Sequence, residues 1–305
     1  MPTDTETRMT APYSELLTLR DLLRWAVSRF NAAGLFFGHG SDNAWDEAAY
    51  LLLHTLHLPL DTLEPFLDAR VLDKERRRFI DIIHERVTTR KPAAYLTGEA
   101  WLRGHRFLVD ERVIIPRSPI AELLEEDLAP WLAAPHAVQR VLDLCTGSGC
   151  LAILAALHFG RAQVDAVDLS PEALALAQKN IAEYGLQARV QALRSDLFQN
   201  LPATQYELIL CNPPYVNSQS MADLPSEYRH EPAMALAGGT DGMNLVRRIL
   251  RDAPRFLAPN GVLVLEIGNE AEHFATAFPE LEPVWLDTET ATGQVLLLER
   301  EQLAS

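Results

Sequence analysis

The chain has 305 residues, 48% of them hydrophobic, which predicts a globular protein with one large domain or two ordinary ones. Its apolar runs are too short to cross a bilayer, and its polar, acid-containing start matches neither a signal peptide nor an Arg-rich transit peptide. The net charge of −15 is divided unevenly, at −2 over residues 1–98 and −13 over residues 99–305. The acidic second part disfavours nucleic acid as the main substrate, because it repels a phosphate backbone, and favours a basic protein partner.

The cysteines are few and none forms a CxxC pair. Cys145, Cys150 and Cys211 all lie in apolar stretches. Reduced core thiols in a cytoplasmic enzyme fit this pattern better than disulfides or zinc, so we expect no metal and no membrane association.

The N-terminal part reads as a small helical domain, residues 1–98. Apolar residues from Leu16 to Phe30 recur every three or four positions, as on one face of a helix. Helix-capping residues 41–43 introduce a second helix that ends before Pro59, and a third runs over 73–90 and stops before Pro92. We expect this domain to recognise the substrate.

Residues 99–118 have an alternating pattern that predicts a β-hairpin linker. Two short apolar runs flank Asp110 and Glu111, which places the predicted turn at those residues.

From Arg140 onward, short apolar strands alternate with helical segments. This order predicts an α/β domain over 119–305, with a mostly parallel sheet covered by helices on both faces. No helix separates the last two predicted strands, around 282–287 and 294–300, so they should pair as an antiparallel hairpin. A ligand of such a sheet binds beyond the carboxyl ends of the strands.

A glycine-rich turn follows the first strand of this domain. In "LDLCTGSGC", Gly147 and Gly149 allow the backbone to approach a ligand at a helix N-terminus. Taken alone, the turn is compatible with NAD, FAD or S-adenosylmethionine, or with a tight turn that binds nothing. The GxGxxG spacing is absent, and the carboxylate of Asp143 favours a cationic cofactor such as a sulfonium. The candidate cofactor-binding residues here are Asp143, Cys145, Thr146, Gly147, Ser148 and Gly149.

Acidic residues also end the next two predicted strands. Asp168 stands where a carboxylate commonly binds both hydroxyls of a ribose, although it could also belong to the cap of the following helix. Asp196 is suited to accept a hydrogen bond from an adenine amino group, with Leu197 or Phe198 against the ring.

The fourth strand ends in "CNPPY". Pro213 and Pro214 lack N–H groups and cannot extend the strand, so Asn212 is held at a rigid elbow. The elbow offers the Asn212 side-chain oxygen and a backbone carbonyl, that of Pro213, as acceptors for an NH2 group, with Tyr215 against its plane. We expect Asn212, Pro213, Pro214 and Tyr215 to be catalytic, with Asn212 also beside the cofactor.

This series of strand ends resembles the Rossmann-like methyltransferases that use S-adenosylmethionine. The resemblance implies a seven-stranded sheet whose last strand is antiparallel, and S-adenosylhomocysteine as the product. The Asn-Pro-Pro-Tyr run is shared by adenine-N6 methyltransferases of DNA or RNA and by protein-glutamine N5-methyltransferases. The helical N-terminal part, "VIIPRSPIAELLEE", "HEPAMALAGGTDGM" and "LEIG" resemble the glutamine enzymes over nearly the whole chain.

Within the glutamine enzymes, "PRSPI", "FGHGSDNAWDEA" and "LPSEYRHEP" resemble the branch that methylates large-ribosomal-subunit protein L-three. The resemblance implies a glutamine of that basic protein as substrate, free or in ribosome assembly intermediates. Asn212, Pro213, Tyr215, Glu231 and Arg117 are the expected substrate-binding residues. The alternatives are a release factor glutamine methyltransferase, an adenine-N6 methyltransferase, and a non-catalytic ribosome-assembly factor.

Overall fold

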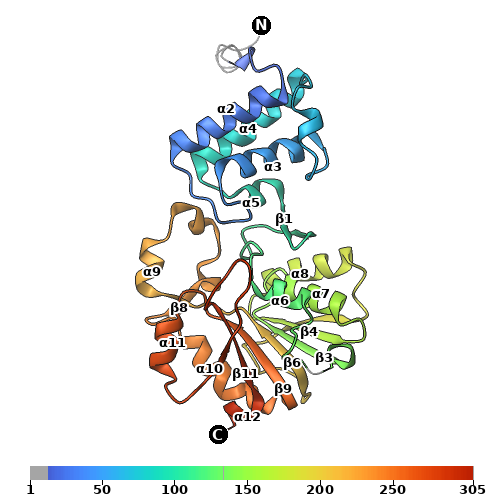
Figure 1. The fold of residues 1–305 in the computed structure, drawn as a ribbon, viewed down its shortest axis with the longest axis vertical. Coiled ribbons are helices and arrows are strands. Elements are labelled where there is room, and N and C mark those ends of the chain that lie inside the picture. Colours follow the sequence, from blue (N-terminus) through green and yellow to red (C-terminus); the bar gives the residue numbers. More distant parts are fainter. Residues whose placement is uncertain (1–12, 133, 305) are drawn as a thin grey trace. The chain divides into compact units, whose positions relative to one another are not determined.

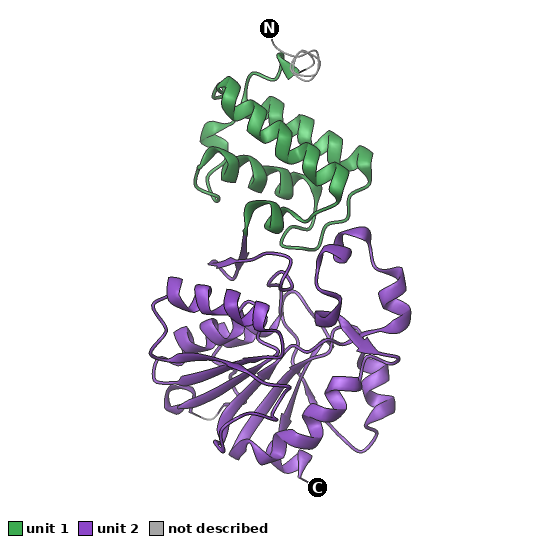
Figure 2. Ribbon diagram, turned by 180° about the vertical axis from the view of Figure 1, so that it is seen from behind, with its two compact units in different colours: residues 1–98 green, residues 99–305 purple. Residues whose placement is uncertain are grey.

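The computed structural model describes residues 13–132 and 134–304. The chain forms two compact units, Met1–Gly98 and Glu99–Ser305, coloured separately in Figure 2. No helix among the described residues is long and apolar enough to cross a membrane.

The first unit is helical and has its own hydrophobic core. Leu22, Phe30, Leu51 and Phe79 are fully buried there. The predicted caps are present in part: Asn43 accepts a hydrogen bond from the Asp46 N–H at 3.0 Å and begins the second helix. Its helices are α2 (Leu19–Ala33), α3 (Ala44–Leu56), η2 (Glu64–Phe66), α4 (Asp73–Thr89) and α5 (Ala93–Thr97).

The second unit begins with a hairpin, but its turn is not where the sequence analysis placed it. Strand β1 (Glu99–Leu102) pairs antiparallel with β2 (His105–Leu108). Arg103 and Gly104, both with positive φ, make the two-residue turn, a geometry that matches the twist of the strands. The prediction of a turn at Asp110 was wrong, because the Asp110 carboxylate instead accepts hydrogen bonds from the Arg112 backbone and side chain.

A seven-stranded sheet forms the body of the second unit, in the order β10-β11-β9-β6-β3-β4-β5. Only β11 runs opposite to the other six, as predicted, and it pairs with both β10 and β9. The strands are β3 (Arg140–Leu144), β4 (Gln163–Asp168), β5 (Val190–Arg194), β6 (Tyr206–Cys211), β9 (Leu257–Glu266), β10 (Val284–Trp285) and β11 (Val295–Glu299).

Helices cover both faces of this sheet (Figure 1). One apolar cluster joins the sheet to α6 (Ile120–Glu125), α7 (Cys150–His158) and α8 (Pro171–Glu183), and a second joins it to α10 (Asn244–Asp252) and α11 (Ala271–Ala277). Buried on both sides, the central strands carry nearly continuous apolar runs. The remaining elements are η3 (Pro135–Ala137), β7 (Val216–Asn217), α9 (Ser218–Asp223), η4 (Ser226–His230), η5 (Ala233–Ala235), β8 (Ala237–Gly239), η6 (Ala253–Arg255) and α12 (Arg300–Leu303).

Candidate active site

Two cavities meet at Asn212, beyond the carboxyl ends of the central strands. The first has a volume of about 210 Å³ and is lined by the ends of β3, β4 and β5 and by α10. The second, of about 230 Å³, is lined by the segment that follows β6 and by residues after β9. Asn212, Ile114 and Ala235 line both cavities, so a group bound in one lies next to a group bound in the other.

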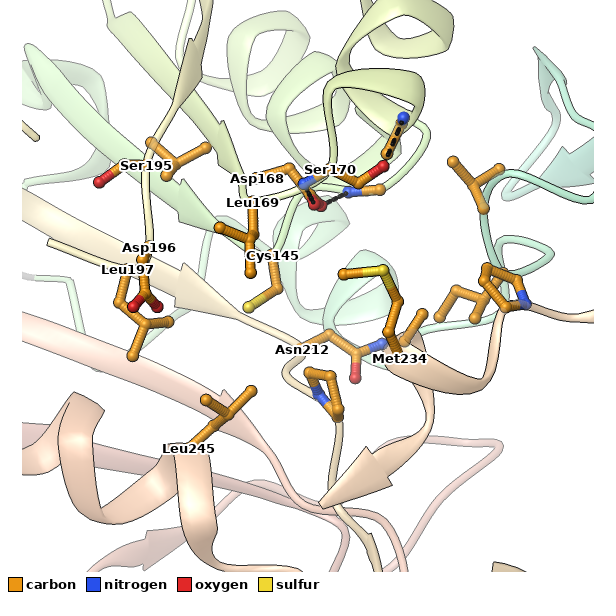
Figure 3. Close-up of a pocket in the computed structure, with 18 of the residues that line it drawn as sticks. Cys145, Asp168, Leu169, Ser170, Ser195, Asp196, Leu197, Asn212, Met234 and Leu245 are labelled. Carbon is orange, nitrogen blue, oxygen red and sulfur yellow. Dashed lines mark hydrogen bonds between the residues drawn. The ribbon is translucent and has the colours of Figure 1, made fainter. Parts of the chain in front are cut away.

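The first cavity is walled by several of the predicted cofactor residues. Figure 3 shows Cys145, Asp168, Asp196, Leu197 and Asn212 around it. Gly147, with φ +54°, lines it as well and has no atom within 4 Å of where a Cβ would be, which leaves the backbone open to a ligand.

Asp168 is fixed by two backbone donors. Its carboxylate oxygens accept hydrogen bonds from the Gly147 N–H at 3.0 Å and the Ser170 N–H at 2.9 Å. Burial raises the pKa of Asp168, although both hydrogen bonds oppose the shift. Each oxygen keeps a lone pair, so the carboxylate can accept from a hydroxyl in the cavity. Ser170 caps α8 separately, through the Ala173 N–H.

Four predicted cofactor residues are not among the residues that line the cavity. Thr146, Ser148 and Gly149 support the glycine-rich turn from behind: Thr146 donates to Asp143, the Ser148 carbonyl accepts from Asn180, and Gly149 packs on Ala177.

The fourth, Asp143, is fully buried beneath the turn. One carboxylate oxygen, Oδ2, accepts hydrogen bonds from the Thr146 hydroxyl at 2.5 Å and the Ala152 N–H at 3.1 Å, while Oδ1 has no partner among the described residues. Burial raises the pKa of Asp143 to about 7. An unpartnered buried carboxylate oxygen behind a cavity that also contains Asp168 suits a cationic ligand.

Sequence reasoning missed the part of the first cavity contributed by α10. Arg248 forms an ion pair with Asp196 at 2.8 Å, and Leu245 lines the cavity beside it. The loop residues Pro232, Met234 and Ala235 close another side. The sequence pattern cannot show that Arg248, on α10, lies next to Asp196, which follows β5.

The elbow after β6 has open acceptors. Among the described residues, none donates a hydrogen bond to the Asn212 side chain or to the Pro213 carbonyl, as the expected site requires. Pro214 lines the first cavity, whereas Pro213 and Tyr215 line the second. The elbow therefore separates the two cavities while Asn212 faces both.

Tyr215 is enclosed by glycines from distant parts of the chain. A Cβ at Gly238 would lie 2.7 Å from the Tyr215 backbone, and Cβ atoms at Gly242 and Gly268 would overlap its carbonyl and its ring. The backbone of β7 pairs with β8 beside it. In the "AGGTDG" run, Gly238 and Gly242 are therefore explained by the space that Tyr215 occupies, and Gly239 by the Asn244 side chain.

Arg117 and Glu231, both predicted to bind substrate, form a pair. Arg117 donates two hydrogen bonds to the Glu231 carboxylate, at 2.5 and 2.7 Å, and its guanidinium lies 5.4 Å from the centre of the Tyr228 ring. Arg117 lines the second cavity, but Glu231 is buried and lines neither. Glu231 also accepts from the Ile115 N–H at 2.9 Å, so in this structure it supports the wall of the second cavity through Arg117.

Two family profiles match the chain, "Methyltransferase small domain" over residues 123–227 and "PrmC N-terminal domain" over residues 21–98. A Bordetella pertussis protein named ribosomal protein uL3 glutamine methyltransferase is 68% identical over 289 residues, covering 95% of this chain and 97% of the relative. Proteins of the same name from Burkholderia pseudomallei and Neisseria gonorrhoeae are 58% and 54% identical, with 97% and 95% of this chain and 98% and 96% of the relatives covered. The chain belongs to the ribosomal protein uL3 glutamine methyltransferase family.

Membership of this family makes the protein an S-adenosylmethionine-dependent methyltransferase, as predicted. The catalytic domain of human Mettl16, solved with an RNA hairpin, aligns with a TM-score of 0.50 at 15% identity, covering 76% of this chain and 84% of that one. At this identity the likeness shows a shared fold alone. No group of three or more His, Cys, Asp or Glu residues in the described ranges is placed to hold a metal ion.

Gly268→Ala should displace Tyr215 and lower methyl transfer by roughly 10- to 100-fold, because the added methyl group overlaps the ring. Gly293→Ala is a matched control, since Gly293 also has positive φ but no atom within 4 Å of the added carbon. The control should cost only about 1 kcal/mol of backbone strain. Equal loss of activity in both variants, measured with thermal unfolding alongside, would contradict the overlap argument.

Asp143 should make stability fall as pH rises. The folded protein keeps the Asp143 proton up to about pH 7, whereas the unfolded chain loses it near 4, so between these values the folded state binds more protons. The free energy of unfolding of the wild type, relative to Asp143→Asn, should drop by up to about 1.4 kcal/mol per pH unit over that range. Urea unfolding of both proteins at several pH values measures the difference in free energy of unfolding. If that free energy changes with pH equally in the wild type and in Asp143→Asn, the prediction is wrong.

Proposed function

We propose that this protein transfers a methyl group from S-adenosylmethionine to the side-chain amide nitrogen, N5, of a glutamine in ribosomal protein uL3. S-adenosylhomocysteine and one proton, which the amide nitrogen loses, are the other products. The observation that carries the proposal is the junction of the two cavities, where no donor in residues 13–132 and 134–304 binds the Asn212 side chain or the Pro213 carbonyl. The names of the relatives supply the protein substrate.

In this proposal the first cavity holds the cofactor. Asp168 accepts hydrogen bonds from the ribose hydroxyls, and Leu197 packs against the adenine beside Asp196. Asp196 is oriented by Arg248, and Gly147 lets the backbone approach. S-adenosylmethionine supplies a methyl carbon made electrophilic by a sulfonium, so the protein's task is to position and orient rather than to activate the donor.

The second cavity receives the glutamine carboxamide. An amide nitrogen is a weak nucleophile because its lone pair is delocalised into the carbonyl group. Two acceptors, the Asn212 oxygen and the Pro213 carbonyl, hold both N–H bonds and aim the nitrogen at the first cavity. Tyr215 packs against the carboxamide plane, and Arg117 forms part of the wall. Such positioning lowers a reaction barrier by about 7–11 kcal/mol in well-oriented systems.

The charge of the chain supports a basic protein partner. Residues 99–305 carry a net charge of −13, which attracts a ribosomal protein and repels DNA. We further propose that residues 1–98 recognise the substrate, that 99–118 link the two domains, and that uL3 is methylated free or in ribosome assembly intermediates in the cytoplasm.

The direct test is to incubate the purified protein with isotope-labelled S-adenosylmethionine in three separate reactions. One contains uL3, one contains release factors, and one contains an adenine-containing oligonucleotide. One glutamine of uL3 should gain a methyl group by mass spectrometry. Labelling of release factors alone would assign the protein to the sister branch of glutamine enzymes, and labelling of the oligonucleotide would support an adenine-N6 methyltransferase.

Substitutions at Asn212 and Asp168 should have separable effects. Asn212→Ala should lower kcat by roughly 100-fold or more while cofactor affinity largely survives, because the residue acts on the glutamine nitrogen. Asp168→Ala should instead weaken binding of S-adenosylhomocysteine by about 1.5–3 kcal/mol, the value of a charge-assisted hydrogen bond. Calorimetric titration measures the loss of cofactor affinity, and steady-state kinetics measures the loss of kcat. Full activity of Asn212→Ala would refute the elbow mechanism and favour a non-catalytic assembly factor.

A further inference from the structure

A buried carboxylate in the wall of the second cavity, Glu266, joins two hydroxyl groups from separate segments of the unit. Glu266, the last residue of β9, accepts a hydrogen bond from the Ser118 hydroxyl at 2.5 Å and another from the Tyr215 hydroxyl at 2.8 Å. Ser118 and Glu266 are each 4% exposed. The three side chains therefore form one chain of hydrogen bonds, Ser118–Glu266–Tyr215, that is closed to bulk water at its inner end.

This chain is the polar anchor of the Tyr215 ring. Among the described residues, the Tyr215 hydroxyl has Glu266 as its hydrogen-bond partner, and its ring is otherwise bounded by the glycine at position 268. Glycines leave room for a ring but exert no directional force on it. The hydroxyl bond to Glu266 is the directional contact that selects one orientation.

Ser118 is itself held rigidly. Its hydroxyl oxygen accepts from the Ile120 N–H at 3.3 Å, and the residues before it are tied to Glu231 through the Ile115 N–H and the Arg117 guanidinium. Ser118 lines neither cavity, so it acts on the site through Glu266. Ser118, in the segment after the hairpin, is thus connected to Tyr215 through Glu266.

We propose that Ser118 and Glu266 are positioning residues that fix the plane of Tyr215 against the glutamine carboxamide. The proposal rests on the function proposed above and extends it to two residues outside the Asn-Pro-Pro-Tyr run. Two hydroxyl donors stabilise the Glu266 carboxylate, which burial otherwise disfavours. Removal of the Ser118 hydroxyl leaves one buried oxygen without a donor, which weakens the acceptor on which Tyr215 depends.

Steady-state kinetics on uL3 test the proposal. Ser118→Ala and Tyr215→Phe should each lower kcat about 10-fold and raise KM for uL3, with affinity for S-adenosylhomocysteine unchanged, because neither residue lines the first cavity. The double variant should lose far less than the product of the two single effects, since both hydroxyls act through one carboxylate. Ser118→Thr, which keeps the hydroxyl, should retain activity.

Tyr184→Phe is a matched control. Its hydroxyl donates to the Arg106 carbonyl at 2.9 Å on the surface, away from both cavities, so the variant should keep wild-type kinetics. Full activity of Ser118→Ala, or a double variant whose loss equals the product of the single losses, would overturn the proposal.

A measurement without methyl transfer separates this inference from the proposed function. 3-Fluorotyrosine placed at position 215 should give a single ¹⁹F line in the otherwise unmodified protein, and Ser118→Ala should shift or broaden it, whereas Tyr184→Phe should not. An unmoved line in Ser118→Ala overturns the positioning role. If the wild type leaves uL3 unmethylated but the line moves as expected, the proposed function fails while the anchoring of Tyr215 stands.

Discussion

The structure depends on the abrupt end of β6. Cys211 is the last buried residue of the strand, and two prolines follow Asn212, so the backbone cannot continue the ladder and turns outward where the parallel strands end. The same edge of the sheet carries the ends of β3, β4 and β5, which places Asn212 between two cavities. A local constraint on φ and on hydrogen bonding thereby sets the distance between donor and acceptor sites.

Around this elbow, buried carboxylates hold the residues that reach the cavities. Asp143 supports the glycine-rich turn, Glu231 holds Arg117, and Glu266 holds Tyr215. The first two line neither cavity, whereas Glu266 lines the second and has both oxygens engaged. A buried carboxylate is costly unless its oxygens accept hydrogen bonds. Glu231 and Glu266, whose oxygens all accept hydrogen bonds, therefore serve as sources of rigidity, and Asp143 supports the turn through one oxygen alone.

The sequence predicted the alternation of strands and helices along the chain, because local periodicity reveals each element. It also predicted which residues end the strands at one edge of the sheet, because parallel strands share one ligand-binding edge. It misplaced the hairpin turn, because Asp110 was taken for a turn residue and Arg103-Gly104 was overlooked. It could not separate residues that line a cavity from those one layer behind, as Asp143 and Glu231 show. That distinction depends on side-chain direction and on partners more than 100 residues apart, such as Ile115 and Glu231.

The elbow alone cannot specify the substrate. In the proposed mechanism, two acceptors beside a methyl donor suit any planar NH2 group, whether in a carboxamide or in adenine. Discrimination must therefore come from what surrounds the second cavity. In this chain Tyr228 and Arg117, the latter paired with Glu231, line that cavity, and the net charge of −13 over residues 99–305 disfavours a phosphate backbone relative to a basic polypeptide. In the proposed mechanism, the end of β6 sets the chemistry, and the walls of the second cavity set the choice of substrate.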